Sequence, residues 1–504
     1  MRIAAALFAV GLAAGAAGAE AAPPRPAYEN SVVGLTVSTQ GWDPDRPWVK
    51  RVPQVKLALG VVVENHRILT TAQMVTDATL IEVEKLGQAV RAKAKVVRVD
   101  PEVDLAILSV DTPDFFDDLE PSRLAGSVPT EGSVLSIRWR SRQLEVSTSR
   151  VSRIEVQPSA LGMLEYPFLY VTTDLKGGGW SEPVFADGRL VGLTVSQDDQ
   201  VARVLPVDVI DSFLEMASEG DGYPGFAGLG FLWQVNEDPA LTSYLGLPGS
   251  PRGVLVTKVF WGGSGCGVLK DRDILLALDG HPIDGSGYYR HPRYGLLRFT
   301  YIVADGHRAG ETIPADVWRD GRQQRVQVTL RPARSDADLM PDRRLDPAPP
   351  YVVAGGLVFR ELDGNYLRSW GDEWRKQAPI RLQMWLWLYS EEQSPERRRV
   401  VILSSVLPDA YNVGYHDIGD TVVREINGRP ISSITQVVEA FKNPEGGFHR
   451  IVLEPNGQRS EIILDAPTFE PATKSILDAY HVSERLRLDE PFPDFGPSCD
   501  GGAP

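Results

Sequence analysis

Three short segments of the chain carry side chains that could perform chemistry: Leu69-Thr-Thr-Ala-Gln-Met-Val75 with Gln73, Asp104-Leu-Ala-Ile-Leu108 with Asp104, and Gly177-Gly-Gly-Trp-Ser-Glu-Pro183 with Trp180 and Ser181. A serine hydroxyl becomes a strong nucleophile when a neighbouring base takes its proton. The amide of Gln73 cannot act as that base, because its nitrogen lone pair is delocalised into the carbonyl. Gln73 can therefore only form hydrogen bonds.

The residues around these segments form short β-rich runs that are separated by turn residues. The runs cover residues 32–38, 57–63, 94–99, 134–138 and 190–195. Short strands at this spacing, with no long helix between them, are typical of an all-β barrel or sandwich. A helix is predicted at 207–217, and the turn-rich stretch 219–225 is predicted to be a linker.

Two further units follow, and the second repeats the pattern of the first. The first unit opens with Gly228-Leu-Gly-Phe231 and continues to about residue 330. The later run Gly355-Gly-Leu-Val-Phe359 mirrors that opening, 400–406 mirrors 253–259, and 420–428 mirrors 273–280. Self-similarity of this kind indicates an internal repeat.

An insertion near residues 365–398 interrupts the second copy of the repeat. Four apolar residues in it have the i, i+3, i+4, i+7 spacing of an amphipathic helix: Leu382, Trp385, Leu386 and Tyr389. Such a helix either packs into the core or fits the groove of a partner.

The order of these units resembles the Deg/HtrA family of serine proteases over nearly the whole chain. In that family the first segment reads Leu-Thr-Asn-Ala-His-Val-Val and the last reads Gly-Asn-Ser-Gly-Gly-Pro. The chain is most similar to the subgroup whose second PDZ domain carries a Gly-Gly-Leu-Val-Phe loop, as at 355–359 here. The resemblance implies a mainly β protein, in which a chymotrypsin-like double β-barrel precedes two PDZ domains, each a small mixed β/α barrel.

The resemblance also divides the chain into parts. The expected parts are a signal peptide at 1–22, a protease-fold domain at 30–218, a first PDZ domain at 226–335, a divergent second PDZ domain with an insertion at 350–470, and a C-terminal tail at 471–504.

The same comparison assigns positions to the candidate catalytic residues. Gln73 stands at the family's histidine position, Trp180 stands at its serine position, and Asp104 retains the triad aspartate. Asp104 either orients a base or accepts a hydrogen bond from the Gln73 amide. Trp180 either blocks the cleft or packs on the barrel rim as a buried aromatic. Ser181 is a nucleophile candidate only in a shifted register.

The glycines before Trp180 fall where the family has its oxyanion loop. Gly178 and Gly179 are the candidates for that loop, whose amides would converge on an anion. The alternative is a mobile glycine-rich loop with no role in binding an anion.

Two further loops match the carboxylate-binding loop of PDZ domains, which takes a peptide C-terminus and adds the peptide as a strand. The first loop consists of Gly228, Leu229, Gly230 and Phe231. The second consists of Gly355, Gly356, Leu357, Val358 and Phe359. The first is predicted to bind peptides, with a purely structural role as the alternative. The second is a candidate for binding peptides in the same way, and the favoured alternative for it is intramolecular or subunit contacts.

The composition and charge of the chain exclude some classes of binding partner. The chain has 504 residues and a net charge of -15, which repels nucleic acid and anionic lipid headgroups. Residues 1–22 have the charged start, short apolar stretch and small-residue cleavage site of an export signal, so a periplasmic or extracellular location is expected. No later stretch is long and apolar enough to predict an integral membrane protein.

The cysteines and histidines indicate neither a metal site nor a cofactor. The seven histidines are scattered singly, and no spacing resembles a zinc site. Cys266 and Cys499 could pair in an oxidising compartment, but 233 positions separate them, so the sequence favours unpaired thiols. The family resemblance implies a homo-oligomer.

Three functions remain compatible with these residues. The favoured one is an exported pseudoprotease that binds peptide C-termini or unfolded segments as a chaperone or adaptor. The second is an active serine endopeptidase that uses Ser181 and an unidentified base. The third is a structural scaffold whose PDZ domains only join subunits.

Overall fold

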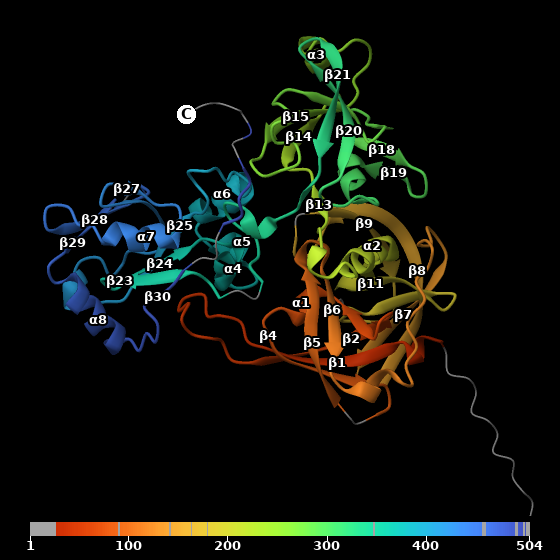
Figure 1. Ribbon diagram of the computed structural model, residues 1–504, viewed down its shortest axis with the longest axis horizontal. Helices are drawn as coiled ribbons and strands as arrows, with labels where there is room; N and C mark the ends of the chain where they lie inside the picture. The colour runs from red at the N-terminus through yellow and green to blue at the C-terminus, as the bar shows by residue number, and fades with distance from the viewer. Residues whose placement is uncertain are drawn as a thin grey trace, which may run out of the picture.

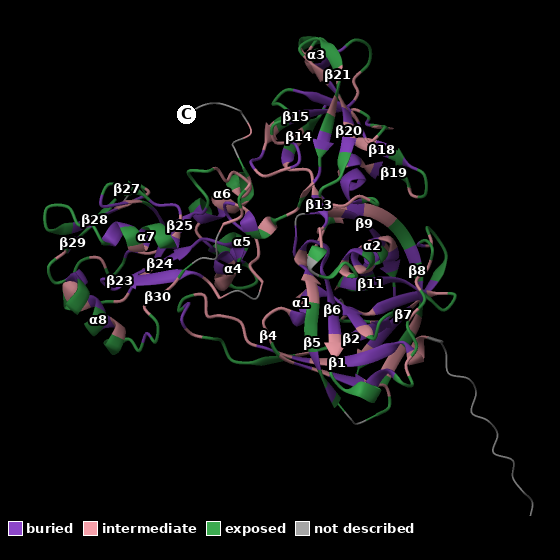
Figure 2. Ribbon diagram, viewed as in Figure 1, coloured by how far each residue is buried: buried purple, intermediate pink, exposed green. Residues whose placement is uncertain are grey.

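The computed structural model describes residues 27–88, 91–140, 143–162, 164–178, 180–345, 348–455, 460–488, 492–496 and 499. The signal peptide expected at 1–22 lies outside the described residues. The described chain is mainly β, with two closed barrels followed by two further antiparallel sheets (Figure 1). Figure 2 shows that buried residues alternate with exposed and intermediate ones along several barrel strands.

The first barrel contains the predicted strands at 32–38, 57–63 and 94–99. Its strands, in barrel order, are β1 (Val32–Thr39), β2 (Gln54–Val63), β3 (Arg67–Thr70), β6 (Leu105–Val110), β5 (Arg91–Asp100) and β4 (Ala78–Lys85). Valine, isoleucine and leucine dominate the inward positions, since branched side chains pack well on a pleated surface. The short helix α1 (Ala72–Val75) follows β3 and carries Gln73.

The second barrel contains the predicted strands at 134–138 and 190–195. Its strands, in barrel order, are β10 (Pro183–Ala186), β11 (Arg189–Asp198), β12 (Val201–Pro206), β9 (Glu165–Thr172), β8 (Gln143–Pro158) and β7 (Ser133–Arg140). Helix α2 (Val207–Ala217) has the predicted bounds. It buries Val209, Ile210 and Phe213 against the barrels.

The third sheet follows the second barrel. Its main path is β14 (Phe231–Val235), β15 (Val254–Val259), β16 (Ile274–Leu278), β20 (Thr312–Arg319) and β21 (Arg322–Thr329), with β17 (His281–Pro282) beside β16. Strand β14 lies at one edge of this sheet. The remaining elements of this part of the chain are α3 (Pro239–Tyr244), the hairpin of β18 (Tyr288–His291) and β19 (Gly295–Arg298), the 3-10 helix η5 (Phe299–Ala304), and the pair β13 (Ala227–Gly228) and β22 (Arg331–Pro332).

The fourth sheet repeats the order of the third, as the sequence repeat predicted. The equivalent strands are β24 (Leu357–Glu361), β25 (Val401–Val406), β26 (Thr421–Ile426), β28 (Phe448–Leu453) and β29 (Glu461–Asp465), with β27 (Arg429–Pro430) beside β26. Here β23 (Tyr351–Ala354) and β30 (Leu486–Arg487) extend the sheet beyond β24. Helices α7 (Ile434–Phe441) and α8 (Phe469–Ala479) complete this part.

The insertion in the repeat is helical. It contains α4 (Gly364–Leu367), α5 (Trp374–Gln377) and α6 (Ile380–Tyr389), and α6 contains the helix predicted from the apolar spacing. Leu382 is fully buried and Trp385 packs against the same core, so the core-packing interpretation holds for that face. Trp387 and Leu388, on another face, are exposed.

Two predictions about the C-terminal part are wrong. The tail expected from residue 471 starts later, because α8 buries Thr473 and Ile476 and β30 pairs with β23. Cys266 and Cys499 form a disulfide, although the sequence favoured free thiols, because the chain after β30 returns to the third sheet.

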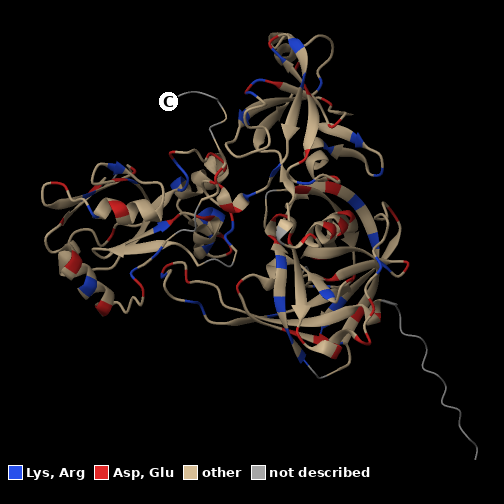
Figure 3. Cartoon of the chain, in the orientation of Figure 1, with Lys and Arg blue, Asp and Glu red and all other residues tan. Residues whose placement is uncertain are grey.

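The fourth sheet also contacts the first barrel. The connection between β1 and β2 extends to it, where Trp48 packs with Tyr351 at a ring separation of 5.8 Å. The Arg487 guanidinium lies over the Trp42 ring and donates to the Pro47 carbonyl. Acidic and basic side chains are interspersed over all these parts (Figure 3), with no block of one sign.

Candidate functional site

Gln73 and Asp104 meet at the junction of the two barrels. The Gln73 side-chain amide donates to Oδ2 of Asp104 at 2.8 Å and to the carbonyl of Val195 at 3.0 Å. The Gln73 backbone amide donates to Oδ1 of Asp104 at 2.9 Å. Both donor hydrogens of the Gln73 carboxamide are therefore used within the protein.

Asp104 is held in a buried and unusual conformation. It follows the 3-10 helix η2 (Pro101–Val103) with a φ of 54°, in the left-handed region that aspartate tolerates. Its exposed fraction is 1%, and burial raises the pKa of its carboxyl to about 7, because water no longer stabilises the charge. The hydrogen bonds from Gln73 and the charge of Arg203 act in the opposite direction.

Ser181 points into the protein. It is fully buried, its φ is 73°, and its Oγ lies 3.0 Å from Oγ1 of Thr70. Its amide donates to the carbonyl of Thr194 at 2.9 Å. Among the described residues, no imidazole, carboxylate or amine forms a hydrogen bond with this hydroxyl, so the geometry gives it no base.

Trp180 is half exposed, with 49% of its surface accessible. The expectation that it packs as a buried aromatic on the barrel rim is therefore wrong. Its amide donates to Oε2 of Glu182 at 2.7 Å. In a peptidase of this fold, the amide at the nucleophile position donates to the oxyanion. Here the chain's own carboxylate accepts that hydrogen bond.

The loop before Trp180 is closely packed against Arg138. The guanidinium of Arg138 donates to the carbonyl of Lys176 and to the side chain of Gln197, and its Nε lies 3.8 Å from the Glu182 carboxylate. A Cβ at Gly178 would lie 2.4 Å from this guanidinium, so a side chain there would have to move Arg138. Gly179 lies outside the described residues. The sequence motifs did not predict these contacts of Arg138 and Glu182.

The loop of Gly228, Leu229, Gly230 and Phe231 leads into the edge strand β14. Gly230 has a φ of 68°, and a Cβ there would lie 2.2 Å from the Cα of Gly263. Beside the loop is a cavity of about 240 Å³, which is also lined by Trp233, Phe260, Trp261 and Phe495. The sequence motif identified the loop but not Trp261 or Phe495, which come from distant parts of the chain.

The loop of Gly355, Gly356, Leu357, Val358 and Phe359 has a different geometry. Gly355 and Gly356 form the two-residue turn between β23 and β24, and both have positive φ. Strand β24 pairs with β23 on one side and β25 on the other. All five residues are buried, so no edge remains at this strand for an added peptide.

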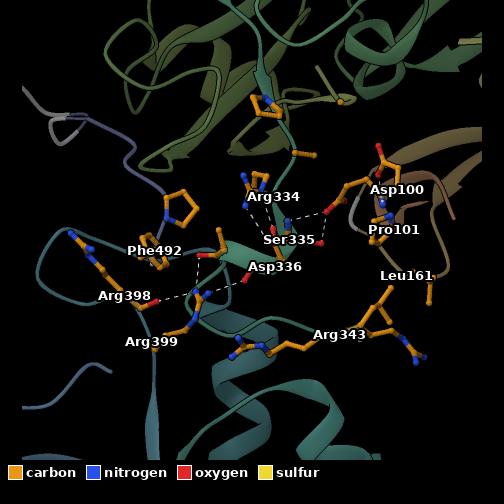
Figure 4. Close-up of a pocket in the computed structure, with 18 of the residues that line it drawn as sticks. Asp100, Pro101, Leu161, Arg334, Ser335, Asp336, Arg343, Arg398, Arg399 and Phe492 are labelled. Atoms are coloured by element: carbon orange, nitrogen blue, oxygen red, sulfur yellow. Dashed lines mark hydrogen bonds and ion pairs between the residues drawn. The ribbon is translucent and has the colours of Figure 1, made fainter. Parts of the chain in front are cut away.

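A larger cavity of about 1350 Å³ lies where the chain passes from the third sheet to the fourth (Figure 4). Charged groups of both signs line it, and many are paired: Ser335 donates to Glu102, and Arg334 lies 3.0 Å from Asp336. Arg399 binds the carbonyl of Asp336 and lies 3.5 Å from Glu361. Many charged side chains of the cavity wall are therefore bound to one another and do not form a site of uniform charge for a ligand.

The described residues contain no group of three or more side chains suited to hold a metal ion. Within the same residues, no helix is both long and apolar enough to span a membrane.

Two barrels that meet at Asp104, followed by PDZ-type sheets, define a trypsin-like peptidase fold with a PDZ domain. Family models for a trypsin-like peptidase domain and a PDZ domain match residues 58–193 and 340–487, respectively. The chain is therefore a homologue of the Deg/HtrA proteases.

Named relatives support this relationship. Protease Do-like 2, chloroplastic, from Arabidopsis thaliana is 26% identical over 480 residues, covering 93% of this chain and 76% of the relative. A probable periplasmic serine endoprotease DegP-like from a Marinomonas species is 26% identical over 303 residues, covering 57% of this chain and 59% of that protein. A solved structure, the HtrA-type protease AlgW with decapeptide, is 20% identical with a TM-score of 0.47, covering 61% of this chain and 98% of that one.

Proposed function

We propose that this protein is an exported Deg/HtrA homologue that has lost peptidase activity and binds peptide segments through its third sheet, as a chaperone or adaptor. The observation that carries the proposal is the Gln73 amide, which donates both its hydrogens to Asp104 and Val195. An amide in that place neither accepts the proton of a nucleophile nor returns one to a leaving amine.

Two further features support the loss of activity. The hydroxyl of Ser181 is fully buried and lies 3.0 Å from that of Thr70. The Trp180 amide is bound to Glu182, which places a negative charge where an oxyanion would develop. A carboxylate there opposes the charge that forms during acyl transfer.

Peptide binding is proposed for the first loop alone. There the edge strand β14, the glycine loop and a cavity lined by both apolar and charged side chains occur together. An edge strand beside such a loop is the combination used for strand addition. The loop at 355–359 is proposed to serve intramolecular contacts, because the β24 edge is occupied and the same sheet packs on Trp48 of the first barrel. We also propose the domain division expected from the sequence, with the second PDZ domain extended to residue 487.

Export and homo-oligomer formation belong to the same proposal. Residues 1–22 have the pattern of an export signal, and relatives carry names that place them in the periplasm, chloroplast or mitochondrion. The oligomer follows from the family resemblance.

A fluorophosphonate probe tests the catalytic part. We expect the purified chain to remain unlabelled, and Ser181→Ala to behave identically. Labelling that disappears in Ser181→Ala would instead establish the active endopeptidase. For binding, peptides with free and amidated C-termini should differ in affinity, and binding of neither peptide would favour the scaffold.

A further inference from the structure

The C-terminal segment, of which residues 492–496 and Cys499 are described, packs on the third sheet although the fourth sheet precedes it in sequence. The Cys266–Cys499 disulfide joins it to the loop that follows β15, across 233 positions. That loop also contacts the candidate peptide loop, because Ser264 donates to the carbonyl of Gly228 and Gly263 abuts Gly230.

Two phenylalanines of this segment pack on Trp261. Phe492 stacks parallel to Trp261 at 6.2 Å between ring centroids, and Phe495 meets the same ring edge-on at 5.2 Å. The guanidinium groups of Arg398 and Arg399 lie over the Phe492 ring, at 5.2 and 4.9 Å, on one side of the large cavity (Figure 4). Trp261 is left only 7% exposed.

Polar contacts fix the backbone of the segment. The indole nitrogen of Trp261 donates to the carbonyl of Gly496 at 3.0 Å, and Arg331 donates to the carbonyl of Phe495 at 3.2 Å. A Cβ at Gly262 would lie 2.7 Å from the Phe495 ring. The receiving surface is therefore shaped for this aromatic side chain.

The segment shares its place with the proposed ligand. Phe495 lines the same cavity of about 240 Å³ as Gly228, Leu229, Gly230 and Phe231. A peptide that enters the cavity beside β14 must displace this ring or bind without that part of the site.

We propose that Phe492-Pro-Asp-Phe-Gly496 is an internal ligand of the third sheet, and that the cavity recognises aromatic segments of the Phe-Pro-x-Phe type. The Cys266–Cys499 disulfide holds this ligand in place, and a dithiol reductant releases it. The proposal rests on peptide binding by the first loop.

Release is a thiol–disulfide exchange. A thiolate of the reductant attacks one sulfur, forming a mixed disulfide and freeing the other cysteine as a thiolate that takes a proton. The second thiol of the reductant then attacks the mixed disulfide, so that two electrons and two protons pass to Cys266 and Cys499. The reductant leaves as a cyclic disulfide.

The tether sets the size of the effect. A short tether gives an effective concentration on the order of millimolar, so a segment with an intrinsic Kd of roughly 10–100 µM should weaken the binding of a competing peptide about 10- to 100-fold in the tethered form. When the Cys266–Cys499 disulfide is reduced, the segment dissociates from the cavity more readily and competes less with added peptide.

Two measurements on the full chain test the proposal. Anisotropy of a fluorescein-labelled Phe-Pro-Asp-Phe-Gly peptide measures binding to the oxidised protein, to the dithiothreitol-treated protein and to the variant Phe492→Ala/Phe495→Ala. Hydrogen exchange of residues 260–264 in the same samples measures release of the segment independently of peptide binding. Phe448→Ala, which removes an exposed phenylalanine from the fourth sheet, is the matched control.

We expect reduction and the double variant each to raise peptide affinity at least about tenfold and to speed exchange at 260–264, while Phe448→Ala does neither. Equal affinity in the oxidised, reduced and variant proteins overturns the internal ligand but leaves peptide binding intact. Faster exchange without peptide binding in any sample overturns the proposed peptide-binding function itself.

Discussion

The side-chain amide of Gln73 donates to the carbonyl of Val195, a residue of the opposite barrel, at 3.0 Å. The same amide donates to Asp104 within its own barrel. The residue at the position of the catalytic base is thus a structural link between the two barrels.

We expect Gln73→Ala to lower the free energy of unfolding, and more at pH 8 than at pH 5. The pKa of Asp104 is raised from 3.8 to about 7, so its protonation stabilises the fold below pH 4 and this contribution is lost as pH rises through 7. Over that range Asp104 lowers stability by up to about 4 kcal/mol, at about 1.4 kcal/mol per pKa unit. Without Gln73 the charged carboxylate loses a donor worth about 1.5–3 kcal/mol.

Urea unfolding at the two pH values, followed by circular dichroism, measures this effect. The control is Asp104→Asn. In this variant the pH-dependent part of the change in unfolding free energy should disappear, whether or not Gln73 is present. An equal loss at both pH values would contradict a role in stabilising the carboxylate.

Restoring the catalytic residues should require the Glu182 position as well. The double variant is Gln73→His/Trp180→Ser, and the quadruple variant adds Ser181→Gly and Glu182→Gly. We expect the double variant to hydrolyse casein roughly 100- to 1000-fold more slowly than the quadruple variant, because the Glu182 carboxylate accepts the hydrogen bond of the residue-180 amide that would otherwise bind the oxyanion. Casein hydrolysis and fluorophosphonate labelling both report the difference. Adding Asp104→Asn to the quadruple variant should abolish its casein hydrolysis. Equal activity of the double and quadruple variants would refute the inhibitory effect of Glu182.

Ser181 and Thr70 should be coupled in stability. Their hydroxyl oxygens are 3.0 Å apart in a fully buried place. We expect Ser181→Ala and Thr70→Val each to destabilise the barrels by about 1 kcal/mol or more, and the double variant to cost about 1 kcal/mol less than their sum. A double-mutant cycle by urea unfolding measures the coupling, and strict additivity would show that the hydroxyls do not interact.

Gly230→Ala should abolish peptide binding by the third sheet. The methyl group would lie 2.2 Å from the Cα of Gly263 at a φ of 68°, so the loop must move. The matched control is Gly246→Ala, at the same φ of 68° with nothing within 4 Å of the added Cβ. That control should cost roughly 1 kcal/mol and leave binding unchanged. Anisotropy with the reduced protein distinguishes the two.

The sequence predicted the regular parts of this fold well, because they depend on local patterns. Short β-rich runs located five of the barrel strands, β1, β2, β5, β7 and β11, and α2 was found at its predicted bounds. The repeat predicted two sheets of the same strand order. The family resemblance then predicted that Gln73 would face Asp104, which the hydrogen bonds bear out.

The features that the sequence did not predict depend on contacts that local spacing does not reveal. The half-exposed Trp180 side chain and the hydrogen bond from its amide to Glu182 belong to a loop conformation that no motif describes. The closed edge at 355–359 depends on β23 pairing with β24. The Cys266–Cys499 pair depends on where the chain goes after β30, which no local spacing reveals.

The long span of that disulfide has a further consequence. It closes a covalent ring that contains the whole fourth sheet and the charged segment that leads to it. A protease of the surroundings that cuts an exposed connection inside this ring would produce two pieces that stay joined. Such a nicked molecule would migrate as one band without reductant and as two bands with it.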